Sequence, residues 1–68
     1  MESTLIKVGG MSCQGCVKSV TNILMALPGV ARAEVSLERG EAAVDFDPAR
    51  VSLEALRQAI DGGGFEAA

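Results

Sequence analysis

The sequence contains no histidine, no tryptophan and no tyrosine, and its only aromatic residues are Phe46 and Phe65. The absence of histidine removes the most common general acid and base of enzymes and one of the usual zinc ligands. The scarcity of aromatic residues means that the core of this 68-residue chain must be aliphatic. We therefore expect one small domain, residues 1–68, that lacks groups suited to acid–base catalysis and is not an enzyme.

Long hydrophobic runs and positive charge are also lacking. No segment approaches the roughly 20 apolar residues that a membrane-spanning helix needs, and residues 1–4 (MEST) lack the basic region of a signal peptide. Six Lys and Arg residues stand against nine Asp and Glu residues, so the net charge is −3. Because nucleic-acid binding requires a basic face, this composition argues against a nucleic-acid partner. We expect a cytoplasmic protein that is not embedded in a membrane.

Both cysteines of the chain lie in one short segment, residues 10–16 (GMSCQGC). Cys13 and Cys16 are separated by two residues, so their sulfur atoms can converge on one soft metal ion or close into a small disulfide. A reducing cytoplasm favours metal binding or redox activity over a structural disulfide. A disulfide across this spacing would also close too short a loop to add much stability.

The hydrophobic pattern predicts four strands and two helices. Apolar and polar residues alternate over residues 4–8, 30–37 and 41–46, which is typical of strands, and residues 65–68 can supply only a short terminal strand. Residues 16–27 carry apolar side chains at spacings of three and four, which indicates an amphipathic helix. Ser52 is a suitable cap for a second helix that ends near Asp61.

This β-α-β-β-α-β order predicts an α+β fold, a ferredoxin-like βαββαβ sandwich with two helices on one face of a four-stranded antiparallel sheet. We expect the helix-to-strand junctions at one end and the strand-to-helix junctions, including the cysteine loop, at the other. The segment around Gly64 and Phe65 then reaches the cysteine loop only if its own loop crosses over. Acids of the second and third strands are expected on solvent-exposed faces away from the cysteines: Glu34, Glu38, Glu41, Asp45 and Asp47.

The cysteine segment falls at a strand-to-helix turn, with Cys16 near the first helical turn. Unpaired backbone N–H groups and the helix dipole favour negative charge there, and hence thiolate over thiol. We expect Met11 to fill the core beneath the loop rather than to act as a thioether ligand. Ser12 suits an exposed tip, and Gly15 offers backbone freedom or room for a partner.

The chain resembles the heavy-metal-associated domain family: small copper chaperones and the N-terminal metal-binding domains of copper-transporting P-type ATPases. The resemblance rests on residues 10–16, 27–30 (LPGV), 44–48 (VDFDP) and 64–67 (GFEA). It implies that Cys13 and Cys16 hold one Cu(I) ion between two thiolates, and that Phe65 lies near the metal loop. The implied partner is a copper-transporting P-type ATPase or its metal-binding domain, which takes the metal through shared-cysteine intermediates.

Several alternatives stay open. Two thiolates also suit Ag(I) or Hg(II), whereas zinc prefers four ligands. Because the mercury-carrying members of the resembled family are periplasmic and no export signal is seen here, copper ranks ahead of a mercury, zinc or cadmium cargo. The rival function is a thioredoxin-like dithiol oxidoreductase, although only one strand precedes the motif and no Trp flanks it. A third is a domain whose cysteines are incidental. The chain is compatible with a free chaperone or an ATPase domain, and with a monomer or a metal-bridged dimer.

Overall fold

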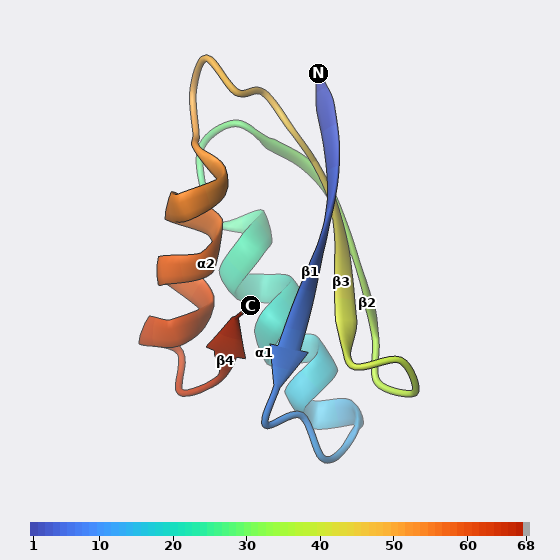
Figure 1. Ribbon diagram of the computed structural model, residues 1–68. Helices are drawn as coiled ribbons and strands as arrows, with labels where there is room; N and C mark the ends of the chain where they lie inside the picture. The colour runs from blue at the N-terminus through green and yellow to red at the C-terminus, as the bar shows by residue number, and fades with distance from the viewer. Residues whose placement is uncertain (68) are drawn as a thin grey trace.

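The computed structural model describes residues 1–67 and contains the predicted elements in the predicted order (Figure 1). The elements are β1 (Glu2–Gly9), α1 (Gln14–Met25), β2 (Val30–Ser36), β3 (Glu41–Phe46), α2 (Leu53–Gly62) and β4 (Glu66–Ala67). The strands form one antiparallel sheet in the order β2-β3-β1-β4, and both helices cover the same face of it. The predicted ferredoxin-like fold is confirmed. Residue 68, the last of the predicted terminal strand, lies outside the described residues.

The core is largely aliphatic and is shared by the sheet and both helices. Val20 and Leu24 of α1, and Leu56 and Ile60 of α2, have no exposed surface. Each pair is four residues apart, so each helix presents one apolar stripe to the sheet. Burial of each large side chain contributes about 1.5–3 kcal/mol. This packing holds α1, and the loop that precedes it, in a fixed position against the sheet.

The helix ends differ slightly from the prediction. Ser52 caps α2 as predicted, since its hydroxyl oxygen accepts a hydrogen bond from the Ala55 N–H at 3.1 Å. By contrast, α1 begins two residues earlier than expected, because Cys13 takes the N-cap position with an extended backbone. It also ends at Met25, and the following Leu27 N–H closes a tighter turn by donating to the Leu24 carbonyl. Within residues 1–67, neither helix has the length and apolar character needed to cross a membrane.

The predicted placement of the loops was wrong. The cysteine loop between β1 and α1 lies at the same end of the molecule as the α2–β4 loop, and the other two helix junctions lie at the opposite end (Figure 1). The physical reason is that β1 and β3 run antiparallel, so the loops that follow them leave the sheet at its opposite ends. Residues 62–65 therefore meet the cysteine loop directly, without crossing over.

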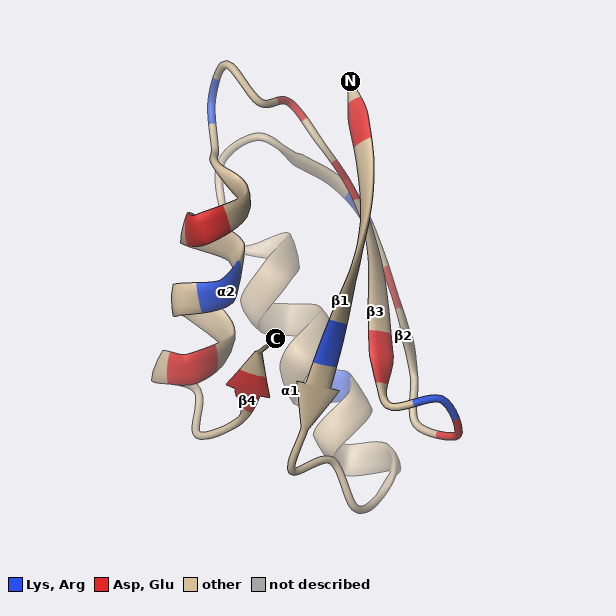
Figure 2. Cartoon of the chain, in the orientation of Figure 1, with Lys and Arg blue, Asp and Glu red and all other residues tan. Residues whose placement is uncertain are grey.

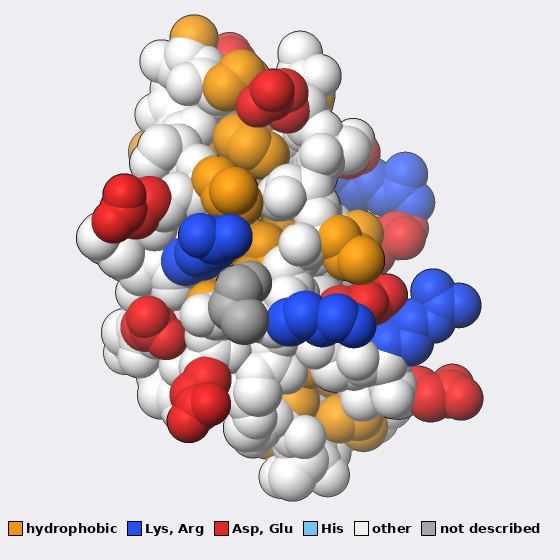
Figure 3. All heavy atoms as spheres, viewed as in Figure 1, with side chains coloured by type: hydrophobic (Ala, Val, Ile, Leu, Met, Phe, Trp, Pro, Cys, Tyr) orange, Lys and Arg blue, Asp and Glu red, His pale blue; other side chains and the backbone are white. Residues whose placement is uncertain are grey.

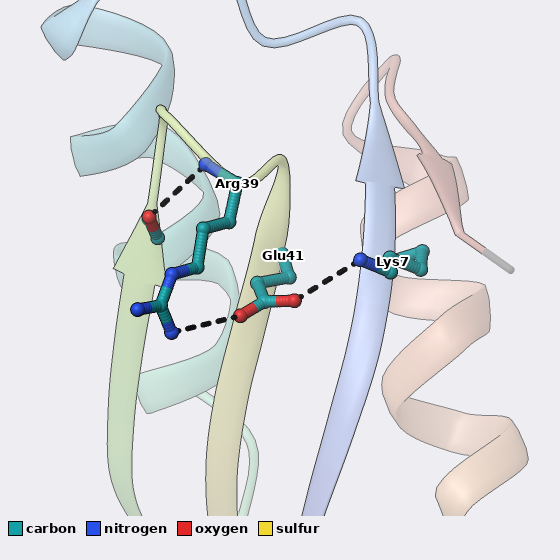
Figure 4. Close-up of polar contacts among 4 residues, drawn as sticks. Lys7, Arg39 and Glu41 are labelled. Atoms are coloured by element: carbon teal, nitrogen blue, oxygen red, sulfur yellow. Dashed lines mark hydrogen bonds and ion pairs between the residues drawn. The ribbon is translucent and has the colours of Figure 1, made fainter.

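Glu41 is buried, contrary to the prediction of a solvent-exposed acid. Its side chain is 11% exposed, and its carboxylate lies 3.2 Å from Lys7 Nζ and 3.7 Å from a guanidinium nitrogen of Arg39 (Figure 4). Glu41 opens β3 directly opposite Lys7, near the end of β1 that leads into the cysteine loop. Of the four other acids in the predicted set, two are exposed and two are half-buried.

Candidate metal centre

The cysteine loop is held by backbone contacts at the start of α1. Cys13 has φ −158° and ψ 172°, and its carbonyl accepts hydrogen bonds from the N–H groups of Cys16 at 3.0 Å and Val17 at 3.4 Å. The carbonyl of the N-cap residue thus begins the helix while its side chain stays outside. Cys16 consequently sits in the first turn of α1, as the sequence predicts.

This backbone brings the two sulfur atoms together. The Sγ atoms of Cys13 and Cys16 are 3.7 Å apart, and both cysteines are free thiols. Cys13 is exposed and Cys16 is half-buried. Two sulfurs that share one metal ion at bond lengths of about 2.3 Å can be at most about 4.6 Å apart. The observed separation therefore fits a single ion bound between the two thiolates.

Hydrogen bonds around Cys16 favour its thiolate. Contacts from the backbone of Ser12, from the Cys13 thiol and from the Cys13 backbone hold the pKa of Cys16 below its ordinary value of 9.0. The Ser12 hydroxyl lies 3.9 Å from Cys16 Sγ and acts in the same direction. Because the thiolate is the form that binds metal, these contacts prepare Cys16 as a ligand.

Of the residues predicted to support the loop, one packs beneath it and two lie on its exposed side. Met11 packs against the hydrophobic core, which agrees with the predicted plug beneath the loop. Ser12 and Gly15 lie on the exposed side, and a Cβ atom at Gly15 would be 3.6 Å from Cys13 Sγ. The contact between Ser12 and Cys16 was not predicted, and its only sequence signal is a spacing of four residues.

Phe65 supports the loop from below. It is half-buried, packs against the core and donates its N–H to the carbonyl of Ile60 at 3.3 Å. Gly10 has φ +91°, a backbone conformation that favours glycine, and a Cβ atom there would lie 3.8 Å from a ring carbon of Phe65. The loop thus turns at Gly10 directly over the Phe65 ring. This contact agrees with the position that the family resemblance implied for Phe65.

The surroundings of the thiols carry few charges. No acid or base lies between residues 8 and 17, and Figure 2 shows the cysteine loop without charge while acidic residues mark α2 and β4. Lys18, on α1, is the first charged residue after Cys16. Within residues 1–67, no group of three or more Cys, His, Asp or Glu side chains gathers to hold a metal. The two cysteine thiols are therefore the candidate ligands in this loop.

Together, the fold and the site define a small ferredoxin-like domain that presents a CxxC pair at its first strand-to-helix turn. Residues 5–66 match the family described as the heavy-metal-associated domain, and the chain belongs to that family. The fold class and family expected from the sequence are both confirmed.

Relatives of this chain include both free-standing proteins and parts of large transporters. It is 41% identical over 68 residues to the copper chaperone CopZ of Bacillus subtilis, covering 100% of this chain and 99% of CopZ. It is 45% identical over 65 residues to human copper-transporting ATPase 2, covering 96% of this chain but 4% of that transporter. A crystal structure of a copper-binding domain from HMA7, a P-type ATPase, superimposes with a TM-score of 0.99 at 40% identity. That match covers 100% of this chain and 92% of the domain.

Proposed function

We propose that this protein binds one Cu(I) ion through Cys13 and Cys16 and passes it to a partner by thiolate exchange. The observation that carries the proposal is the pair of free thiols, 3.7 Å apart, in an exposed loop. Its membership of the heavy-metal-associated family and its similarity to copper chaperones and copper-transporting ATPases support the same assignment.

The donor set favours a soft ion of low coordination number. Two thiolates satisfy Cu(I), and they also suit Ag(I) and Hg(II). Structural zinc sites have four protein ligands. Among residues 1–67, Cys13 and Cys16 are not joined by a third Cys, His, Asp or Glu side chain. Zinc would therefore have to recruit water or a second molecule, which makes it a poorer cargo than copper.

Transfer follows from the exposure of the site. An incoming thiolate of the acceptor can form a new sulfur–copper bond, after which one of the two original sulfur–copper bonds breaks. The metal remains Cu(I) throughout, and the departing thiolate takes up a proton from solvent. Cys13 is the more exposed ligand, whereas the Ser12 hydroxyl lies 3.9 Å from the sulfur of Cys16. We assign Cys13 as the ligand that leaves first.

The partner we propose is a copper-transporting P-type ATPase or its metal-binding domain, because a copper-binding domain from one P-type ATPase shares this fold. We place the exchange in the cytoplasm, where a reducing environment keeps exposed thiols free. The metal-free protein is proposed to be a single domain and a monomer at low concentration, with ligand sharing between two exposed sites as the route to a metal-bridged dimer.

Anaerobic titration of the reduced protein with Cu(I), in competition with a chelator, tests the proposal. We expect one copper per chain, weak zinc binding in the parallel titration, and loss of tight copper binding in Cys13→Ser and Cys16→Ser. Ala49→Ser, an exposed position in the β3–α2 loop at the opposite end of the molecule (Figure 1), serves as the control. Tight zinc binding with poor retention of copper would overturn the assignment of the metal. Failure to bind either metal, together with rapid reduction of disulfide substrates, would establish the oxidoreductase instead.

A further inference from the structure

Gly15 is a glycine inside a helix at a position where the backbone does not require one. It is the second residue of α1, and it is not among the four glycines of the chain that have a positive φ. Its carbonyl accepts a hydrogen bond from the Ser19 hydroxyl at 3.1 Å, one helical turn further on. A Cβ atom built at Gly15 would lie 3.6 Å from its nearest neighbour, which is ordinary van der Waals contact. A larger residue therefore fits this position without backbone strain.

Glycine is nevertheless an unfavourable residue for this position of the helix. It loses more conformational freedom on folding than any other residue, and it forms helices less readily than alanine. Gly29 shows the contrast, since its φ is +99° and a Cβ atom there would lie 2.8 Å from the Cβ atom of Arg50. The fold excludes a side chain at Gly29 but not at Gly15. The advantage of glycine at position 15 therefore lies outside the stability of the helix.

The atom that a side chain at position 15 would contact is the sulfur of Cys13. This Sγ atom is the neighbour 3.6 Å from the Cβ atom built at Gly15. Cys13 is exposed, and its sulfur lies 3.7 Å from that of Cys16, with which it would share a metal ion. The absence of a side chain at position 15 thus leaves one flank of the Cys13 sulfur uncovered.

Charge close to the thiols does not restrict the approach to this flank. Residues 9–17 include no acid or base, and Figure 3 shows no red or blue side chain on the lowest part of the molecule, where the cysteine loop lies in Figure 1. Salt screens more distant charges over about 10 Å. The space around Cys13 is therefore the local property that distinguishes one incoming thiol from another.

We infer that Gly15 determines which thiols can take copper from this protein, by leaving the Cys13 sulfur open to the bulky thiolate of a protein partner. The inference rests on the proposed function. In the exchange, a sulfur–copper bond to the incoming thiolate forms, the bond between Cys13 and copper breaks, and the metal stays Cu(I). The released Cys13 thiolate takes up a proton from solvent. Gly15 binds nothing itself, and a larger residue in its place would restrict the exchange to small thiols.

Alkylation of the reduced, metal-free protein measures access to Cys13 directly. Iodoacetamide and N-tert-butyl iodoacetamide carry the same electrophile and differ in bulk, and tandem mass spectrometry separates Cys13 from Cys16. In Gly15→Leu, the rate at Cys13 should fall about tenfold more for the bulky reagent than for iodoacetamide, because the added methylene groups oppose its approach. A change in the thiolate fraction affects both reagents alike and cancels in their ratio.

Gly62→Leu is the matched control. Gly62 is the exposed last residue of α2, and a Cβ atom there would have no neighbour within 4 Å. The same substitution is thus made in a helix without covering a sulfur, and the ratio of the two alkylation rates should equal that of the original protein. Gly15→Ala should not lower the melting temperature, because alanine is the better helix former.

Transfer of copper between two copies of the protein tests the consequence for exchange. Copper-loaded protein is mixed with a nitrogen-15-labelled, metal-free copy, and native mass spectrometry follows the metal. Loaded Gly15→Leu should deliver copper to the labelled copy about tenfold more slowly than loaded Gly62→Leu, and the delay should be smaller with glutathione as acceptor.

Two results would overturn the inference. One is an equal ratio of alkylation rates in Gly15→Leu and Gly62→Leu, which would show that residue 15 does not limit access to Cys13. The other is a marked fall in the melting temperature of Gly15→Ala, which would show that the fold itself requires this glycine. Absence of copper binding would instead refute the proposed function, while the alkylation ratio would still decide whether residue 15 controls access to Cys13.

Discussion

At the scale of single residues, the two cysteines are not equivalent. Cys13 precedes α1 and is exposed, whereas Cys16 lies inside the first turn and receives hydrogen bonds from the loop. The helix N-terminus favours a thiolate at Cys16, and contacts from Ser12 and Cys13 hold the pKa of Cys16 below its ordinary value. A symmetric CxxC motif therefore becomes an asymmetric pair of ligands once the chain folds.

This asymmetry predicts the pH dependence of alkylation. The folded pKa of Cys16 lies below the ordinary value of 9.0, principally because of the Ser12 backbone contact. In the native protein, the rate at which iodoacetamide modifies Cys16 should rise at lower pH than it does in urea-unfolded protein. Mass spectrometry of the resulting peptides separates Cys16 from Cys13. Ser12→Ala should change the profile little, because the backbone contact remains. Identical profiles for folded and unfolded protein would contradict the prediction.

The sign of the linked stability follows from the direction of the shift. A thiol with a lowered folded pKa releases its proton from the native state first, so stability increases as pH rises from the folded value toward 9.0. The stabilisation is lost as pH falls through the folded pKa. Cys16 thus contributes to stability on the alkaline side of its own titration and not on the acidic side.

At the scale of elements, the cluster of Lys7, Arg39 and Glu41 connects β1 to the β2–β3 hairpin. Glu41 is the one buried acid among residues 1–67, and both of its carboxylate oxygens face a cation. The two cations are themselves 65% and 76% exposed, so water screens much of the attraction. The contribution of the cluster therefore depends mainly on keeping the buried carboxylate paired.

We expect Glu41→Gln to lower the free energy of unfolding by about 1 kcal/mol, because the buried side chain at this position loses its two ionic contacts. Glu34→Gln is the matched control: Glu34 is 62% exposed and pairs with Arg32, two residues earlier on the same strand, β2. Its loss should change stability by less than about 0.5 kcal/mol. Urea unfolding followed by circular dichroism measures both values. Equal effects would show that burial of Glu41 has no energetic consequence.

The elements also show what the sequence could and could not predict. The alternation in β1 and the spacing of apolar residues in both helices depend on local periodicity, so the strands, helices and core faces were predictable. The burial of Glu41 was not, because it requires the register that places Lys7 opposite it. The contact between Gly10 and Phe65 depends on which loops share an end of the sheet, and that follows from strand direction rather than from any local pattern.

The cysteine pair was the part of the candidate site that the sequence predicted best. Its spacing and its position before a helix predict two convergent sulfurs, and the structure places them 3.7 Å apart. The support from Ser12 could not be read in the same way, because a serine in a loop can direct its hydroxyl in several directions. Such second contacts become visible only when the backbone of the turn is known.

At the scale of the whole molecule, stability and metal binding are coupled through a small core. A domain near 60 residues buries only about 60% of the surface of its unfolded chain. Leu56 has no exposed surface, and Leu56→Ala should cost about 2–5 kcal/mol, a large share of the total for so small a domain. The metal-free variant should therefore be partly or wholly unfolded at room temperature, which circular dichroism can measure.

Cu(I) binding should increase the folded fraction of the Leu56→Ala protein. The gain in stability should be smaller than the copper affinity of the native state alone would give. A ligand that binds only the native state at 1,000 times its dissociation constant adds about 4.1 kcal/mol. Cys13 and Cys16 are three residues apart, so both thiols stay close in the unfolded chain, which then also binds copper and reduces the gain. What the native loop adds is the lowered pKa of Cys16 and the fixed sulfur separation.

Thermal unfolding with and without Cu(I) should thus show a rise in melting temperature that vanishes when Leu56→Ala is combined with Cys13→Ser and Cys16→Ser. A rise that survives removal of both cysteines would place the copper elsewhere. No rise with the cysteines present would mean that the folded loop binds copper no better than the unfolded chain.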